Sequence, residues 1–264
     1  MYAFEYHRPT TLSDALAGLQ NEDAKPLAGG MTLLPTMKQR LAAPSALIEL
    51  TGIAELSGIS REGGNLVIGA MTRHAEVARS SAVQGAIPAL AKLAAGIGDP
   101  HVRNRGTIGG SIANNDPAAD YPAAALGLGA TIVTSKRRIA ADDYFKGLFE
   151  TALDPGEIIT GVSFPVPEKA GYMKFANPAS RYALVGVFVA KTAGGVRVAV
   201  TGAGANGVFR LPDFESALAA NFSPAAIEGL TVPADGKISD IHADADYRAH
   251  LIGVMARRAV AAAG

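Results

Sequence analysis

Two clusters of glycine constrain this chain more than any other feature of its sequence. The first occupies residues 28–35, AGGMTLLP, and the second residues 105–111, RGTIGGS. Each places consecutive backbone N–H groups, unshielded by side chains, beside a hydroxyl group. Such a segment can hold a phosphate without Lys or Arg, and a pair of them suits a diphosphate. The alternative is that each cluster is a tight turn packed against a helix.

A third glycine cluster, residues 202–207, has the sequence GAGANG and fits the G-x-G-x-x-G pattern of dinucleotide-binding loops. That pattern requires a helix to begin at its third glycine, so that the pyrophosphate meets the helix N-terminus. Pro212 follows too closely to leave room for that helix, and residues 219–223 contain no acid for a ribose. We therefore expect a plain loop between a strand and a helix here.

Composition excludes several classes of chemistry. The chain has no cysteine, which excludes disulfides, thiolate zinc sites, protein-ligated iron–sulfur clusters and cysteine nucleophiles. Its 24 basic side chains balance 24 acidic ones, which argues against nucleic-acid binding. The five histidines show no metal-ligand spacing and no G-x-S-x-G motif occurs, so we expect neither a metal site nor a catalytic side chain. The charged fraction of 18% hints that a partner covers part of the surface.

Two features bear on location. The N-terminus carries an early acid and no apolar stretch of the kind found in signal peptides. The longest uncharged apolar run, roughly residues 122–135, is too short for a membrane span. We expect a cytoplasmic protein without a membrane-spanning segment.

The first fifty residues predict a compact alternation of strands and helices. Thr11 and Asp14 have the spacing of a capping box, and the leucines and alanine at 12, 15, 16 and 19 give the following helix one apolar face. Strands are expected at residues 25–28 and 47–50, with a helix at 33–40 between them. This order fits a βαβ unit.

Residues 53–165 mix strands with alanine-rich helices. Strands are expected at 66–68, 130–134 and 158–164, and helices at 83–95 and 117–126. Asp116 precedes Pro117 and is expected to cap the second helix. Asp120 would then lie one turn further along the same face, as a solvated acid.

The proline-rich stretch 164–171 predicts the main domain boundary. Antiparallel strands are expected after it at 172–175, 184–191 and 196–201, with a hairpin turn at 193–195. Helices are expected at 214–220 and 246–263. The predicted fold class is α+β, with one domain at 1–165, divided into subdomains of about 1–52 and 53–165, and a second α+β domain at 172–264.

Several segments together resemble one family. Residues 98–111 and 115–122, with 28–35, 155–159 and 174–182, closely resemble the FAD-binding (medium) subunit of molybdenum hydroxylases of the carbon monoxide dehydrogenase and xanthine dehydrogenase type. The resemblance runs in order over nearly the whole chain. It implies an FAD-binding domain of two α/β subdomains, similar to the PCMH/vanillyl-alcohol-oxidase type. The C-terminal domain would then be of the carbon monoxide dehydrogenase flavoprotein type, with an antiparallel sheet.

The resemblance also implies a set of FAD-binding residues. The first cluster would hold the diphosphate and ribityl region with Leu27, Ala28, Gly29, Gly30, Met31, Thr32 and Leu33. The far side of the diphosphate and the adenosine would be met by Thr107, Gly110, Ser111 and Asn114. The remaining implied contacts are Ile97 packing on a ring, Asp120 accepting from cofactor hydroxyls, Ile159 lining the pocket, Lys174 near the isoalloxazine and Tyr182 near its face. Met31 departs from the family, whose members often carry a polar residue there.

The function that the resemblance implies is electron transfer within a molybdenum dehydrogenase. FAD would take electrons from iron–sulfur clusters of a small partner subunit, next to a large subunit with the molybdenum cofactor, and pass them to NAD, a quinone, O₂ or another acceptor. The family suggests a dimer of heterotrimers, and the absence of cysteine fits clusters that reside on another polypeptide. The organic substrate would bind in another chain.

Two other functions compete with this one. The chain could be a flavin-carrying assembly or binding module without turnover of its own. It could also be a freestanding nicotinamide-dependent oxidoreductase that uses residues 202–207. Flavin bound to the purified protein would count against the second of these, and reduction of that flavin by the cluster-bearing subunit would count against the first.

Overall fold

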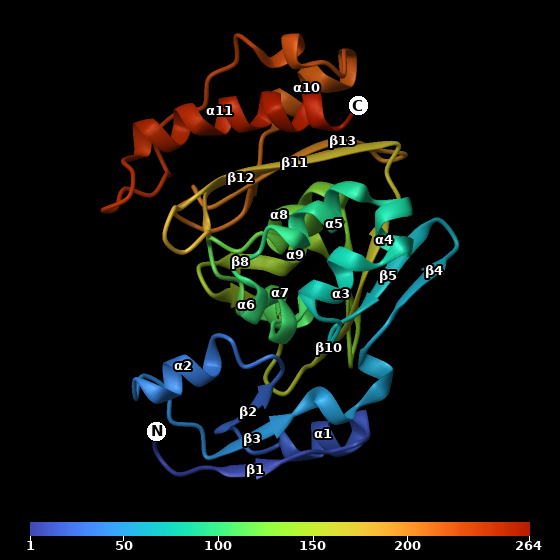
Figure 1. The fold of residues 1–264 in the computed structure, drawn as a ribbon, viewed down its shortest axis with the longest axis vertical. Coiled ribbons are helices and arrows are strands. Elements are labelled where there is room, and N and C mark those ends of the chain that lie inside the picture. The colour runs from blue at the N-terminus through green and yellow to red at the C-terminus, as the bar shows by residue number, and fades with distance from the viewer.

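The computed structural model describes residues 1–264, and three sheets stack along the long axis of the molecule (Figure 1). The sheet at the N-terminal end is parallel, in the order β1-β3-β2, with strands β1 (Glu5–His7), β2 (Ala24–Leu27) and β3 (Ala46–Glu49). Helix α1 (Leu12–Gly18) precedes β2, and α2 (Leu33–Lys38) connects β2 to β3. The predicted βαβ unit is therefore confirmed.

Local chemistry explains where α1 begins. The Thr11 hydroxyl oxygen accepts a hydrogen bond from the Asp14 amide at 3.1 Å, which satisfies one of the free N–H groups of the first turn. Ala15 and Leu19 are buried in the N-terminal core, on the predicted face of the helix.

The middle layer contains an antiparallel sheet of five strands in the order β4-β5-β10-β6-β7. Its strands are β4 (Ile59–Glu62), β5 (Asn65–Gly69), β6 (Thr131–Thr134), β7 (Arg138–Ala140) and β10 (Ile159–Pro165). Short helices pack against it: α3 (His74–Arg79), α4 (Ser81–Ala86), α5 (Pro88–Ala95), α6 (Pro100–Arg105), α7 (Ile108–Asn114), α8 (Tyr121–Leu128) and α9 (Ala141–Tyr144). A small hairpin follows, made of β8 (Phe145–Gly147) and β9 (Glu150–Thr151). Three 3₁₀ turns complete the chain, at Leu50–Gly52, Ala54–Leu56 and Pro224–Ile227.

The third sheet lies between two layers of helices (Figure 1). Its antiparallel strands are β11 (Lys169–Ala176), β12 (Ala183–Thr192), β13 (Gly195–Thr201) and β14 (Phe209–Arg210), with α10 (Pro212–Ala220) and α11 (Ala245–Ala262) after them. Helix α11 covers one face, and α5 and α8 cover the other. The three predicted long strands, their hairpin turn and the two C-terminal helices are confirmed.

Strand β12 shows why this sheet is covered on both sides. Its side chains alternate between two cores: Val185, Val187 and Val189 pack in the core that contains α11, and Phe188 and Ala190 pack in the core that contains α8. Because successive residues of a strand point to opposite faces, an uninterrupted apolar run requires cover on both. The chain crosses from β10 to β11 within the proline-rich stretch; the division into domains there remains a prediction.

Two predicted helices are wrong in their boundaries. The helix expected at 83–95 is two helices, broken at Ile87, whose φ of −142° is not helical. Pro88 is responsible, because a residue before proline avoids the helical conformation. The helix expected at 117–126 begins instead at Tyr121, and Pro122 rather than Pro117 lies in its first turn.

The acids near α8 also differ from expectation. Asp116 does not cap a helix; its Oδ1 accepts from the Ala118 amide at 2.9 Å in a local turn. Asp120 occupies the position before the helix and is only 5% exposed, so it is not the solvated acid that spacing alone predicted. The loop expected at residues 202–207 follows β13 as predicted, but it leads to the short strand β14 rather than directly to a helix.

None of the helices is both long enough and apolar enough to cross a membrane.

Close packing of α11 on β11 gives a first prediction. A Cβ at Gly171 would lie 2.0 Å from the Ala259 carbonyl oxygen, so Gly171→Ala must push the helix off the sheet. We expect a loss of about 1–3 kcal/mol in unfolding free energy, measured by urea denaturation. Gly64→Ala is the matched control, because a Cβ there meets nothing within 4 Å. Equal urea midpoints for the two variants would contradict this packing.

Candidate cofactor-binding site

A cavity of about 590 Å³ brings the first two glycine clusters together. It is lined from the N-terminal sheet, the middle layer and the loop before β12. Of the predicted site residues all but Lys174 line it, namely Leu27, Ala28, Gly29, Gly30, Met31, Thr32, Leu33, Ile97, Thr107, Gly110, Ser111, Asn114, Asp120, Ile159 and Tyr182. The contacts that these residues make with a cofactor remain predictions.

The first cluster offers an uninterrupted row of backbone donors. The chain turns at Gly30, whose φ is +72°, a conformation that glycine adopts without strain. The first amide of α2 with a hydrogen-bond acceptor is that of Leu34, which donates to the Gly30 carbonyl at 3.2 Å. The five amides before it, Gly29 to Leu33, donate to no acceptor in the protein. Five successive free N–H groups on a cavity wall form a binding site for anionic oxygens.

The second cluster has a different role from the one expected. Thr107 caps α7, and its hydroxyl accepts from the Gly110 amide at 3.1 Å. The Gly109 amide donates to the Ala70 carbonyl at 2.8 Å, and the amide of Ser111 donates to the carbonyl of Thr107 at 3.0 Å. The prediction of a second row of free amides is therefore wrong for residues 105–111. This segment and α7 offer two side-chain groups to the cavity instead, the Ser111 hydroxyl and the Asn114 amide. Neither has a hydrogen-bond partner elsewhere in the protein.

Glycine is required where the two clusters meet. A Cβ at Gly29 would lie 2.1 Å from the Arg105 carbonyl oxygen and 2.8 Å from the Gly106 Cα. A Cβ at Gly109 would lie 2.5 Å from the side chain of Ala70. The tight-turn alternative thus describes the second cluster, and the donor row describes the first.

Asp120 lines the cavity and belongs to a buried polar cluster. The Tyr172 hydroxyl donates to it in a short hydrogen bond, and Lys174 Nζ lies 3.0 Å from its Oδ1. Lys174 also donates to the Gly96 carbonyl at 2.9 Å. It therefore contacts Asp120 without lining the cavity itself. Burial raises the pKa of Asp120, while Lys174 and the Tyr172 hydroxyl oppose that rise.

His74 is a lining residue that sequence reasoning did not select. Its ring is 5% exposed and lies 5.3 Å, centroid to centroid, from that of Tyr121. Burial, with a smaller effect of Arg103, lowers the pKa of His74 to about 4. The imidazole is therefore neutral near pH 7. No spacing in the sequence marked it, because its neighbours Arg103 and Tyr121 come from α6 and α8.

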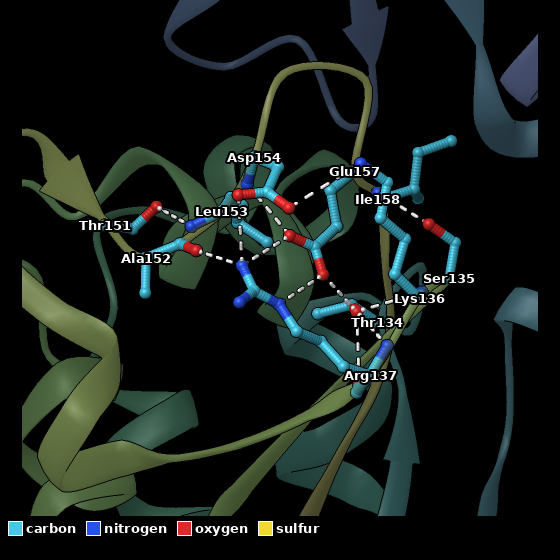
Figure 2. Close-up of polar contacts among 10 residues, drawn as sticks. All are labelled: Thr134, Ser135, Lys136, Arg137, Thr151, Ala152, Leu153, Asp154, Glu157 and Ile158. Atoms are coloured by element: carbon cyan, nitrogen blue, oxygen red, sulfur yellow. Dashed lines mark hydrogen bonds and ion pairs between the residues drawn. The ribbon is translucent and has the colours of Figure 1, made fainter.

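Glu157 is the second lining residue that was missed, and Figure 2 shows the contacts that hold it. Its carboxylate, fully buried, accepts from the Thr134 hydroxyl at 2.5 Å and the Asp154 amide at 2.8 Å. Arg137 donates to it through Nε at 3.2 Å and Nη2 at 3.1 Å. The same Nη2 reaches the Ala152 carbonyl at 2.7 Å.

This cluster fixes one wall of the cavity. Leu153, Glu157, Ile158 and Ile159 all line it, and Ser135 adds two further bonds to Ile158 through its amide and hydroxyl. Burial alone would raise the pKa of Glu157, but the hydrogen bonds from Arg137, Asp154 and Thr134 lower it to about 2. The ionised Glu157 side chain therefore links β6 to the start of β10.

The site contains no arrangement suited to a metal ion, since no group of three or more His, Cys, Asp or Glu side chains converges anywhere in the chain. The site is thus built of backbone donors, a few polar side chains and apolar walls.

The chain is similar to known proteins over nearly its whole length. Residues 2–167 match the family described as the FAD binding domain in molybdopterin dehydrogenase. The carbon monoxide dehydrogenase medium chain of Afipia carboxidovorans is 38% identical, over 98% of this chain and 96% of its own length. The nicotine 6-hydroxylase medium subunit of Paenarthrobacter nicotinovorans is 37% identical, over 99% of this chain and 98% of its own length.

Solved structures agree over the whole chain. Carbon monoxide dehydrogenase from Hydrogenophaga pseudoflava, in a form that lacks the Mo-pyranopterin moiety of the molybdenum cofactor, superposes with a TM-score of 0.90 at 37% identity. The match covers 99% of this chain and 97% of that one. Quinoline 2-oxidoreductase from Pseudomonas putida superposes with a TM-score of 0.89 at 30% identity, over 99% and 97% of the two chains. The α+β fold expected from the sequence is confirmed.

The Glu157 cluster predicts a defined pH dependence of stability. Its folded pKa of about 2 lies below the ordinary 4.5, so its contribution is complete above pH 4.5 and is lost as the pH falls toward 2. Glu157→Gln removes the titration, so the stability gap between wild type and variant should narrow by about 2 kcal/mol from pH 7 to pH 3. Urea denaturation across this range measures it. Glu55→Gln, at an exposed position, should differ from wild type by the same unfolding free energy at every pH. If the difference for Glu157→Gln were also constant, the stabilising role of the Glu157 carboxylate would be refuted.

Proposed function

This chain belongs to the family of FAD-binding medium subunits of molybdenum hydroxylases, and we propose that it carries electrons through such a complex. It is an oxidoreductase subunit, and FAD is its cofactor. In the proposed sequence, iron–sulfur clusters of a small partner subunit deliver electrons that a molybdenum-containing large subunit takes from the substrate. The electrons leave to NAD, a quinone, O₂ or another acceptor. When bound, FAD supplies this redox chemistry, because it exchanges electrons singly or in pairs.

The row of free amides from Gly29 to Leu33 is the observation that carries the proposal. A diphosphate needs several donors at once, and a set of fixed backbone N–H groups meets that need without the conformational freedom of lysine side chains. Ser111 and Asn114 supply further hydrogen bonds from another part of the lining. Leu27, Ile97 and Ile159 offer apolar surface for the ring systems.

The buried side chains position this site rather than react. Lys174 and Tyr172 hold Asp120 in one orientation, so that the acid keeps its place in the lining of the cavity. The Glu157–Arg137 pair holds another part of the wall. Neutral His74 adds no charge to the site at pH 7. We infer no general acid or base, since a subunit of this kind needs none.

The proposed assembly follows the family. The chain would join a large and a small subunit in a dimer of heterotrimers located in the cytoplasm. The flavin-carrying module without turnover remains the second candidate, because the same cavity would serve it. The nicotinamide-dependent alternative is disfavoured by residues 202–207, which lead into strand β14 rather than a helix.

The close approach of the two glycine clusters predicts the effect of a single methyl group. In Gly29→Ala the new Cβ meets the Arg105 carbonyl, so the clusters must separate and the amides lose their alignment. The variant should purify with less than about a tenth of the wild-type FAD, because tight binding depends on several simultaneous hydrogen bonds. Flavin absorbance measures the content, and cooperative thermal unfolding checks the fold. Gly85→Ala, where a Cβ meets nothing within 4 Å, should keep full FAD.

Electron transfer is tested separately from cofactor binding. The FAD-loaded chain is mixed in a stopped-flow instrument with its cluster-bearing partner subunit, previously reduced. We expect bleaching of the oxidised-flavin absorbance. A loaded chain that stays oxidised beside its reduced partner would leave the carrier module as the correct account.

A further inference from the structure

Residues 1–52 form a layer that no polar contact ties to the rest of the molecule. The layer contains the N-terminal sheet with α1 and α2 and lies at one end of the stack (Figure 1). Every hydrogen bond and ion pair of residues 1–49 has its partner within residues 1–52. The same layer carries the free amides from Gly29 to Leu33. The main donors of the site therefore belong to the layer that is least bonded to its neighbours.

The third sheet is joined to the middle layer in the opposite way. Arg197 Nη2 donates to both carboxylate oxygens of Asp142 at 2.7 Å, which links β13 to α9. Phe188 of β12 belongs to the large core of the middle layer, whereas residues 1–65 contribute no buried side chain to that core. One outer layer is thus bonded to the centre of the molecule and shares its core, and the other does neither.

An apolar seam joins the N-terminal layer to the middle layer. Met71 and Ile158 are the residues beyond residue 56 that enter the N-terminal core. Arg105 and Glu49 attract each other across the seam without forming an ion pair. Apolar contacts have no fixed direction, so the two surfaces can part and meet again without leaving buried polar groups unpaired.

The chain crosses the seam once, and both ends of the crossing are fixed. On the near side Gly52 packs on Pro9, since a Cβ there would lie 2.5 Å from the Pro9 carbonyl oxygen. On the far side the Leu56 carbonyl accepts from the Met71 amide at 2.7 Å. Residues 53–55 are left between these two points as a short pivot.

The cofactor cavity lies across this seam. Residues 25–33 line it from the N-terminal layer, and most of its other lining residues belong to the middle layer. A ligand in the cavity can therefore bond to both layers at once and supply the polar contacts that the seam lacks. A ligand that binds the closed arrangement better than an open one shifts the population toward closure.

We propose that residues 1–52 are a lid that turns about residues 53–55 to admit the cofactor and closes when its free amides bind the diphosphate. The inference rests on the proposed function, because it takes FAD as the occupant of the cavity. The lid moves as one body, since its sheet and helices are bonded to one another, so the row of amides keeps its shape while the lid is open. Hinged layers of this kind control how a ligand enters and leaves.

Two spin labels measure the movement, and the absence of native cysteine lets each label attach at one chosen position. Ser13→Cys on α1 and Ala82→Cys on α4 place them at exposed positions of the lid and the middle layer. Electron double resonance on the full chain should give a broad distribution of distances without FAD and a narrow one with FAD.

Ala82→Cys with Ala219→Cys on α10 is the control pair, because it joins the middle layer to the third. Its distance distribution should be the same with and without FAD. A lid pair whose distribution FAD leaves unchanged, or a control pair that narrows as much as the lid pair, would overturn the inference.

Truncation at the seam gives the second readout. Leu56 is 1% exposed, packs in the N-terminal core and does not line the cavity. Leu56→Ala should release FAD about tenfold faster than wild type, because less apolar contact holds the lid closed. Leu90→Ala makes the same truncation in the main core and should release FAD at the wild-type rate. Flavin fluorescence after dilution of the FAD-loaded chains follows the release.

Equal release of FAD from Leu56→Ala and Leu90→Ala would contradict the lid. The spin-label measurement needs no truncated variant, so it decides the question alone if either variant unfolds. None of these results touches the proposed function, which fails only if the chain binds no FAD or its partner cannot reduce it.

Discussion

The contact between Gly29 and the Arg105 carbonyl is the constraint on which the rest of this structure depends. It joins two segments that are distant in the sequence, the loop after β2 and the end of α6, with no side chain between them. The approach places five unpaired amides, the Ser111 hydroxyl and the Asn114 amide on the walls of one cavity. A cofactor with an elongated anionic centre can then be held by groups that need no reorganisation.

Two ion pairs keep the walls of this cavity in place; Asp120–Lys174 is buried, and Glu157–Arg137 joins a buried carboxylate to a partly exposed guanidinium. Asp120–Lys174 ties the start of α8 to β11, and Glu157–Arg137 ties the start of β10 to the end of β6. A buried pair such as Asp120–Lys174 adds little net stability, because desolvation offsets its attraction, but losing one partner is costly. Their value here is geometric. They hold Asp120 and Glu157 in place beside the cavity.

Sequence reasoning predicted the layers of this fold well and its polar contacts poorly. The strands of the third sheet follow from an apolar run such as residues 183–190, because only a sheet covered on both faces accommodates it. The break before Pro88 was predictable from its steric effect on Ile87, but the alanine-rich run on both sides obscured it. Asp120 was out of reach, because Lys174 and Tyr172, which bury it, lie more than fifty residues away.

The glycine clusters show the same division. The glycine pattern predicted that either cluster could bind a phosphate or form a tight turn. It could not distinguish free amides from bonded ones, because that depends on partners such as Ala70 and Thr72. The resemblance to a family supplied the cofactor, and the geometry shows which cluster offers donors to it.

The amide resonances of the labelled chain test the central claim most directly. In ¹⁵N–¹H spectra recorded with and without FAD, the amides of Gly29 to Leu33 should shift strongly downfield as they begin to donate to the diphosphate. Those of Gly109, Gly110 and Ser111 should shift far less, because they already donate within the protein. Large shifts confined to the second cluster, with the first unchanged, would contradict the account.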